Sequence, residues 1–331
     1  DLSRLTGTVE LRVTNDTAVP LGAVPIWLFP NRFTTPGPGI TDRTVNWIYP
    51  AGSSVGRMTI STPRWNSDLL DHEQVVLDPL PAGGTPEGAR RVLGRVRLPS
   101  PLAPGETGVL LFGFQVEIPE RRGRFGRWRG TAVLGNGWFP RPLTDLTARR
   151  TDLPPDRISA DIALELPAGH GAVLIDRVFP PQEVAQRIEA PGLVAEAFPL
   201  VVQDRMVVTE QQQSWGTAVY VSRDVRKRRA GWRDTRGTVG SFPRGLPRVG
   251  LVDIPARGLK VVEQPAGLLR ADAPACRLPE RLVIVEIPAW DRLVQTGPGN
   301  LLVSDRLWRL IPFEEVLSFH DLVLARGIGA E

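Results

Sequence analysis

Proline and glycine interrupt this chain so often that it has room for few long helices. The sequence contains 32 prolines and 33 glycines among 331 residues, which is about a fifth of the chain. Proline lacks a backbone donor and glycine tolerates turn conformations, so both residues separate short segments. This punctuation predicts short strands joined by turns.

Between these interruptions, apolar and polar residues alternate with period two, as in strands with one exposed face. The predicted strands cover residues 8–13, 92–98, 109–118, 161–167, 201–202, 206–208 and 216–221, with a turn at residues 104–106. A regular series of short strands is typical of packed antiparallel sheets. We therefore predict a mainly β chain whose first domain, residues 1–222, is an antiparallel β-sandwich or saddle.

The remainder of the chain has a different pattern. Residues 222–247 are rich in arginine, glycine and proline and predict a linker or exposed loop. The helices expected from periodicity cover residues 182–188 and about 313–326, and the later strands cover residues 250–254, 259–263, 282–287 and 301–304. Mixed strands followed by a helix predict that residues 223–331 form the start of a smaller α/β domain, which is incomplete in this sequence.

Arginine supplies nearly all of the basic residues, since only Lys227 and Lys260 among the 40 are lysines. We interpret this bias as codon usage in a GC-rich bacterial genome. The net charge is only +4, so the high pI says little about a polyanionic partner.

Two segments nevertheless interleave arginine with aromatic rings, at residues 121–129 and 223–236. In the second segment, Arg226, Arg228 and Arg229 are candidate contacts to phosphates. Neither segment carries a recognised nucleic-acid motif. We expect a solvated hairpin and a solvated linker here, and no nucleic acid as a partner.

A single cysteine, Cys276, excludes an internal disulfide and any site with several thiolate ligands, and we expect it to be a buried apolar residue. No window approaches the roughly 20 apolar residues of a membrane-spanning helix. Because the chain begins at Asp1, we expect that an export signal or a membrane anchor has been removed and that the protein is exported or associated with the bacterial cell envelope.

Four segments carry patterns that occur together in one family. Residues 7–30 run from an amphipathic strand through a Thr-Asn turn to an apolar strand, and residues 102–114 contain Leu-Ala-Pro-Gly-Glu. Residues 131–143 contain Gly-Trp-Phe-Pro, and residues 280–305 contain an apolar strand, a loop and a second strand. In this order, the segments resemble the zinc aminopeptidases of the aminopeptidase N type. The resemblance implies a β-rich domain followed by the start of a thermolysin-like α/β domain.

The sequence departs from this family where the family's chemistry resides. The resemblance aligns the family's substrate loop with Gly297, Pro298, Gly299 and Asn300. In the family, this loop has the sequence Met-Glu-Asn, and its glutamate binds the amino terminus of the peptide. The aligned residues of this chain include no carboxylate. The resemblance also aligns His320, Asp321 and Leu324 with the zinc helix, where leucine has no lone pair to donate. We therefore predict no catalytic residue, no metal ligand set and no cofactor in this chain.

Other candidate sites have simpler interpretations. Asp68, Asp71, His72 and Glu73 lie close together in sequence, but acidic residues in such a loop are usually surface residues. His170 lies in a predicted turn without a partner in sequence. No G-x-S-x-G element offers a serine nucleophile.

Three functional hypotheses follow. We favour a non-catalytic aminopeptidase-like module that binds an unknown protein or peptide, or has a structural role. The alternative is the first part of an active zinc metallopeptidase, with zinc as cofactor and its H-E-x-x-H motif beyond residue 331. A second alternative is an arginine-rich β protein that binds a polyanion.

Overall fold

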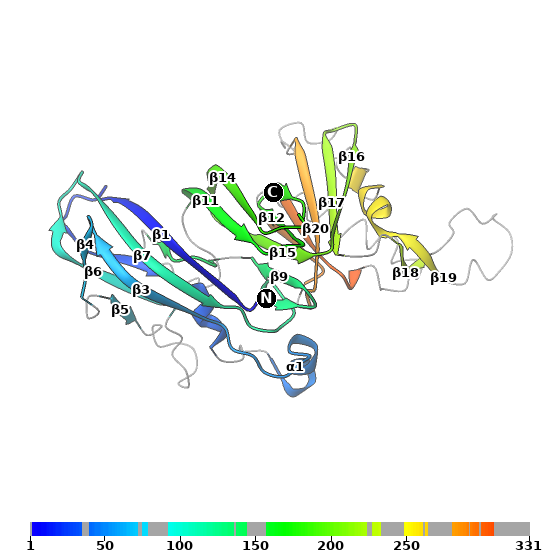
Figure 1. Cartoon of the computed structure of the whole chain (residues 1–331), viewed down its shortest axis with the longest axis horizontal. Coiled ribbons are helices and arrows are strands. Elements are labelled where there is room, and N and C mark those ends of the chain that lie inside the picture. The colour runs from blue at the N-terminus through cyan, green and yellow to red at the C-terminus, as the bar shows by residue number, and fades with distance from the viewer. Residues whose placement is uncertain are drawn as a thin grey trace. The chain divides into compact units, whose positions relative to one another are not determined.

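The structure, a computed structural model, consists mainly of β-strands, which confirms the predicted fold class (Figure 1). Several of its sheets are antiparallel, as the period-two pattern predicts. The structure describes residues 2–34, 40–71, 75–78, 92–135, 137–143, 157–223, 227–232, 248–260, 262–263, 280–290, 292–297 and 299–307.

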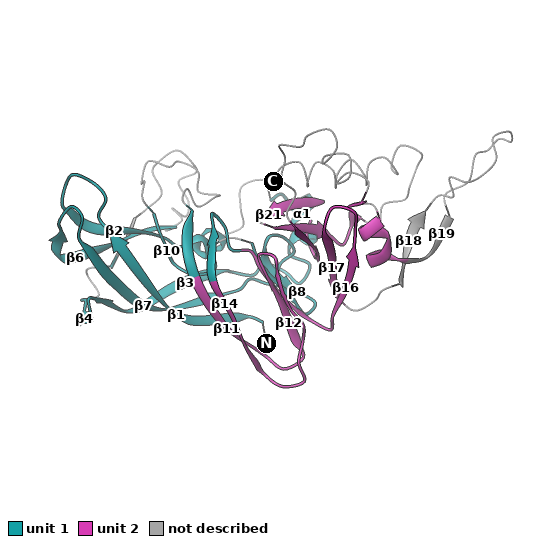
Figure 2. Ribbon diagram, turned by 90° about the horizontal axis from the view of Figure 1, so that it is seen from above, with its two compact units in different colours: residues 1–160, 192–198 teal, residues 161–191, 199–331 magenta. Residues whose placement is uncertain are grey.

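The chain divides into two compact units (Figure 2). The first consists of Asp1–Ala160 and Gly192–Phe198, and the second of Asp161–Pro191 and Pro199–Glu331. Each unit is therefore assembled from two separate stretches of sequence.

The first unit contains two four-stranded antiparallel sheets. In spatial order, one sheet consists of β1 (Arg4–Thr14), β7 (Thr107–Glu117), β3 (Arg57–Trp65) and β4 (Asp68–Leu69). The other consists of β10 (Arg141–Pro142), β2 (Leu21–Trp27), β6 (Leu93–Leu102) and β5 (Val75–Asp78). Every second residue of β7 is buried, including Leu110, Phe112 and Val116, so the predicted alternation places one face of this strand in the core.

Shorter elements complete this unit. They are the 3-10 helix η1 (Phe29–Phe33), the helix α1 (Asp42–Ile48), and the hairpin of β8 (Phe125–Trp128) and β9 (Thr131–Leu134). The hairpin turns through Arg129 and Gly130, which both have positive φ, 48° and 77°. Two positive φ values are typical of the primed turns whose twist matches that of the flanking strands.

Residues 192–198 belong to the first unit because three side chains of the segment 138–141 bind them. The indole Nε1 of Trp138 donates to the carbonyl oxygen of Phe198 at 2.7 Å, and the ring of Phe139 lies 5.7 Å from that of Phe198. The buried guanidinium of Arg141 donates to the carbonyl oxygen of Glu196 and lies over the Phe198 ring. The Gly-Trp-Phe-Pro sequence is thus part of the core.

The strands β11 (Ile158–Leu166) and β14 (Gln186–Ala195) form a two-stranded sheet, and the chain passes from one unit to the other within each of them. The remaining strands belong to the second unit. Three further strands are hydrogen-bonded neighbours, in the order β13 (Arg177–Phe179), β12 (His170–Leu174) and β15 (Leu200–Asp204).

The second unit also contains a five-stranded mixed sheet. Its spatial order is β16 (Met206–Gln212), β17 (Thr217–Arg223), β20 (Arg281–Ile287), β22 (Asn300–Ser304) and β21 (Val294–Gly297). The three central strands are parallel, and the outer pairs are antiparallel. Parallel strands are buried on both faces, which explains their continuous apolar sequences.

A helix over residues 254–260 contributes to the core of this sheet. Its Ile254 and Leu259 cluster with Tyr220, Ile284 and Leu301. A separate two-stranded sheet precedes the helix and consists of β18 (Lys227–Trp232) and β19 (Arg248–Asp253).

The prediction of a strand at residues 259–263 is wrong, because these residues are helical where the structure describes them. The Asp253 carboxylate accepts a hydrogen bond from the Ala256 amide at 3.1 Å, as an N-terminal cap does. Pro255 lies in the first turn, where its missing amide hydrogen costs nothing. Burial of Ile254, Leu259 and Val262 then follows helical periodicity.

Two other local predictions are also wrong. Residues 182–188 are not helical; strand β14 begins at Gln186 and buries Ile188 and Ala190 alternately, since pairing with β11 outweighs helix propensity. Residues 222–247 are not only a loop, because β18 lies within them and pairs with β19. Residue 222 itself lies within β17, and the predicted domains 1–222 and 223–331 stay predictions.

Trp138→Phe tests the attachment of residues 192–198. The substitution removes the indole donor and leaves the buried Phe198 carbonyl without that hydrogen bond, so we expect a loss of about 1–3 kcal/mol of unfolding free energy. Urea denaturation followed by circular dichroism measures the change. Trp47→Phe, at a half-exposed position of α1, is the control and should change stability by less than about 0.5 kcal/mol. Equal effects of the two substitutions would contradict this role of Trp138.

Candidate functional site

The candidate substrate loop is a tight turn between β21 and β22, in which Gly297 pairs with Asn300. Gly299 has a φ of 66°, and a Cβ atom there would lie 2.8 Å from the Cβ atom of Asp176. Both observations require glycine, because other residues rarely adopt this φ and a side chain would displace Asp176. Pro298 lies outside the described residues. The turn therefore leaves no room for a side chain at residue 299.

The side chain of Asn300 points into the protein and is only 1% exposed. Its Nδ2 donates to the carbonyl oxygen of Ile175 at 2.7 Å, in the turn between β12 and β13. Ile175 has a positive φ of 59°, which is unfavourable for a β-branched residue, and its amide donates to the Pro199 carbonyl at 3.0 Å. Asn300 thus acts as a clamp on a strained turn.

The chemistry of this clamp differs from that of a carboxylate anchor. An amide is neutral, whereas a peptide amino terminus is a cation that a carboxylate binds with a charge-assisted hydrogen bond. The amide donor of Asn300 is also already used by Ile175. The loop is therefore suited to holding two turns together.

A second polar cluster lies at the carboxyl ends of β17 and β20. The hydroxyl of Tyr220 donates to Oε2 of Glu286 at 3.1 Å, and the Glu286 side chain is buried. Nε2 of Gln203 donates to the backbone carbonyl of Glu286 at 2.8 Å. Hydrogen bonds of this kind compensate for the desolvation of a buried polar group.

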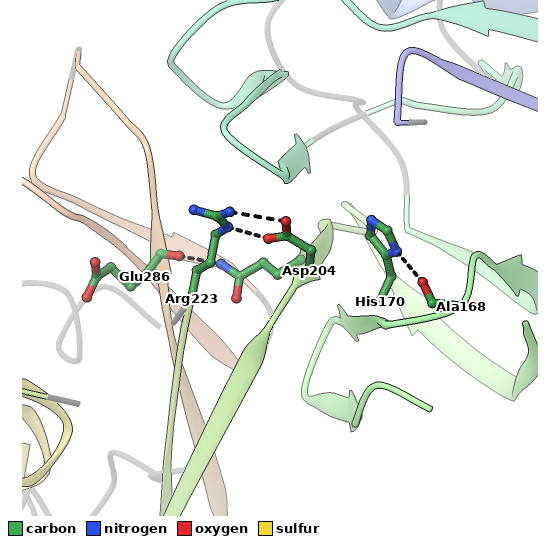
Figure 3. Close-up of polar contacts among 6 residues, drawn as sticks. Ala168, His170, Asp204, Arg223 and Glu286 are labelled. Carbon is green, nitrogen blue, oxygen red and sulfur yellow. Dashed lines mark hydrogen bonds and ion pairs between the residues drawn. The ribbon is translucent and has the colours of Figure 1, made fainter. Parts of the chain in front are cut away.

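Figure 3 shows Glu286 together with a nearby ion pair. The guanidinium of Arg223, at the end of β17, donates through Nε and Nη2 to the two carboxylate oxygens of Asp204, at the end of β15. The Nη2–Oδ2 distance is 3.1 Å. This two-pronged geometry fixes the ends of two strands relative to each other.

Glu286, Tyr220 and the Asp204–Arg223 pair are functional-site candidates that no sequence motif indicated. A signal for Glu286 exists, because it is the one charged residue within the apolar run 282–287. Tyr220 and Asp204 have no such signal, since their partners lie 66 and 19 residues away. The carboxyl ends of parallel strands are a common place for ligands, and here the carboxylates of Glu286 and Asp204 accept hydrogen bonds from protein side chains.

The other predicted site residues are described only in part. Asp68 and Asp71 are exposed, while His72 and Glu73 lie outside the described residues. His170 is at the start of β12, where its Nδ1 is 2.9 Å from the Ala168 carbonyl oxygen (Figure 3). Within the part of the chain that the structure describes, no group of three or more His, Cys, Asp or Glu residues is arranged to hold a metal ion.

The structure describes only the backbone of two further predicted site residues and does not describe the others. His320, Asp321 and Leu324 lie outside the described residues, as does Arg226. The backbones of Arg228 and Arg229 lie in β18, opposite Val252 and Leu251. In the described ranges, no helix has the length and apolarity needed to cross a membrane.

Comparison with known proteins gives matches among solved structures. No protein-family profile and no curated protein sequence matches the chain. A variant of a two-domain M1 zinc metallopeptidase bound to L-tryptophan is 17% identical, with a TM-score of 0.47, and the match covers 98% of this chain. An M1 zinc metallopeptidase from Deinococcus radiodurans is 17% identical, with a TM-score of 0.43 and 98% coverage. This chain spans 60% and 59% of the lengths of those two proteins.

Asn300→Ala tests the clamp. Without the carboxamide, the buried Ile175 carbonyl loses its donor, and we expect a loss of about 1–3 kcal/mol of unfolding free energy. Asn300→Asp should cost more at neutral pH, because a carboxylate would face a carbonyl oxygen, and less in acid, where a protonated carboxyl group can donate. Urea denaturation at two pH values measures both effects.

The control is Gln211→Ala, at an exposed position of β16, which should change stability by less than about 0.5 kcal/mol. A clamp role would be wrong if Asn300→Ala were as mild as this control, or if Asn300→Asp were as stable as the unsubstituted protein at neutral pH.

Proposed function

We propose that this chain is a non-catalytic relative of the aminopeptidase N type zinc aminopeptidases that binds a protein or peptide or has a structural role. The observation that carries the proposal is the turn at residues 297–300. Where the family resemblance implies a carboxylate for the peptide amino terminus, this chain has a closed turn whose Asn300 binds the Ile175 carbonyl.

The ordered sequence patterns support the aminopeptidase part of the proposal. All four resembling segments overlap described strands: β1 and β2 in residues 7–30, β7 in residues 102–114, β9 and β10 in residues 131–143, and β20 and β22 in residues 280–305. Residues 131–143 also contribute Trp138 and Arg141 to the core.

The donor set at residues 320–324 supports the non-catalytic part. Catalytic zinc sites use three protein ligands and keep an open position for water. The aligned positions offer the imidazole of His320 but only an alkyl group at Leu324. These residues do not fit a zinc site, and we derive no catalytic step from them.

The experiment uses the full-length natural protein, purified without chelators or a histidine tag. We expect elemental analysis to find far less than one zinc ion per folded chain after zinc is resupplied and excess is removed. We also expect leucyl and arginyl p-nitroanilides to be hydrolysed no faster than in buffer.

About one tightly held zinc ion per chain, together with hydrolysis that a chelator abolishes, would overturn the non-catalytic proposal. That outcome would favour the alternative hypothesis, in which this chain is the first part of an active peptidase whose zinc ligands lie beyond residue 331. Circular dichroism before and after zinc treatment ensures that folded protein is compared.

A further inference from the structure

The arginine-rich segment 119–130 is hydrogen-bonded to helix α1 and to the loop that follows it. The Arg122 amide donates to the carbonyl oxygen of Ile48, the last residue of α1, at 2.8 Å. The Glu120 amide donates to the Ser54 hydroxyl, also at 2.8 Å. We use the name arginine face for six residues that lie in these bonded segments or next to the bonded residues: Trp47, Val55, Arg121, Arg122, Arg124 and Arg129.

Several guanidinium groups of the arginine face lie over aromatic rings. Arg121 lies 4.8 Å from the centre of the Phe33 ring, and Arg122 and Arg129 lie 5.2 Å and 5.6 Å from that of Trp128. Arg121 and Arg122 are only partly exposed. The expectation of a fully solvated hairpin is therefore wrong at these positions, because stacking on aromatic rings holds the side chains.

The charge of the segment is strongly positive. Residues 119–130 contain five arginines and one carboxylate, Glu120, which pairs with Arg127 at 3.2 Å. Arg129 is exposed at the tip of the β8–β9 hairpin, and its position is fixed by the tight turn. Ordered cationic side chains lose less conformational entropy when they bind an anion.

Two exposed apolar residues adjoin the residues that bond this segment. Trp47 and Val55 are each 51% exposed, and each is next in sequence to a residue that bonds the arginine-rich segment, Ile48 and Ser54. Tryptophan combines an apolar body with a polar N–H group and is enriched at membrane–water interfaces. A surface that carries both arginine and tryptophan suits a phospholipid membrane, in which headgroup phosphates lie above an apolar layer.

We propose that the arginine face binds the surface of a membrane that contains anionic phospholipids. The guanidinium groups contact headgroup phosphates, and the Trp47 and Val55 side chains enter the interfacial layer. Single-stranded nucleic acid fits less well, because it needs aromatic faces for base stacking. Guanidinium groups already lie over the Phe33, Tyr49 and Trp128 rings.

Sedimentation with sucrose-loaded vesicles tests the proposal on the full chain. Vesicles with roughly one-third phosphatidylglycerol in phosphatidylcholine should bind the protein at low salt and release it at high salt. Vesicles of phosphatidylcholine alone should bind far less. Arg124→Gln combined with Arg129→Gln should lower the partition coefficient by more than tenfold, at about fivefold for each arginine.

The matched control is Arg12→Gln combined with Arg97→Gln, which removes the same charge from exposed positions of β1 and β6. It should leave vesicle binding within about twofold, since distant exposed charges are screened. Trp47→Ala should lower the partition coefficient by several fold while the protein retains its circular dichroism spectrum.

Three outcomes would overturn the proposal. The first is an absence of binding to anionic vesicles by folded protein, and the second is an equal loss of binding in the control and the Arg124/Arg129 variant. The third is tight binding of a thymidine oligonucleotide that displaces the protein from vesicles and depends on the same two arginines. That result would assign the face to single-stranded nucleic acid.

Discussion

The parallel pairing of β17 with β20 and of β20 with β22 is the constraint on which the second unit depends. Parallel neighbours need a crossover connection, because a tight turn cannot join them. The chain therefore leaves the sheet after Arg223 and returns at Arg281, and this connection contains the helix over residues 254–260. Such strands are buried on both faces, so any polar residue within them requires a partner in the protein.

That requirement explains the polar residues of the candidate site. Glu286 interrupts an apolar strand and accepts a hydrogen bond from Tyr220, and Asn300 begins β22 and binds the Ile175 carbonyl. Both are strand residues whose side chains form a hydrogen bond within the fold. A carboxylate that holds a peptide amino terminus must instead face the substrate, so the chemistry at Asn300 favours a structural role for this turn.

Sequence patterns predicted the elements that depend on local alternation. The strands β1, β7 and β17 were predictable because apolar residues alternate or run continuously in each. The strand β14 and the helix over residues 254–260 were not, since their conformations depend on a pairing strand and on an Asp253 cap followed by proline. The candidate loop was predicted as a loop without a carboxylate. The hydrogen bond from Asn300 in this loop to the Ile175 carbonyl was not predictable, because the two residues are 125 positions apart in sequence.

The most direct test of the account compares peptides with free and acetylated amino termini. A digest of mixed peptides and its acetylated copy are passed together over the immobilised full-length protein, and mass spectrometry gives the recovery of each form. Because the turn at residues 297–300 contains no carboxylate, we expect the two forms of each retained peptide to be recovered equally. A marked preference for free amino termini would contradict the account, because it would require a carboxylate site that recognises the terminal ammonium group.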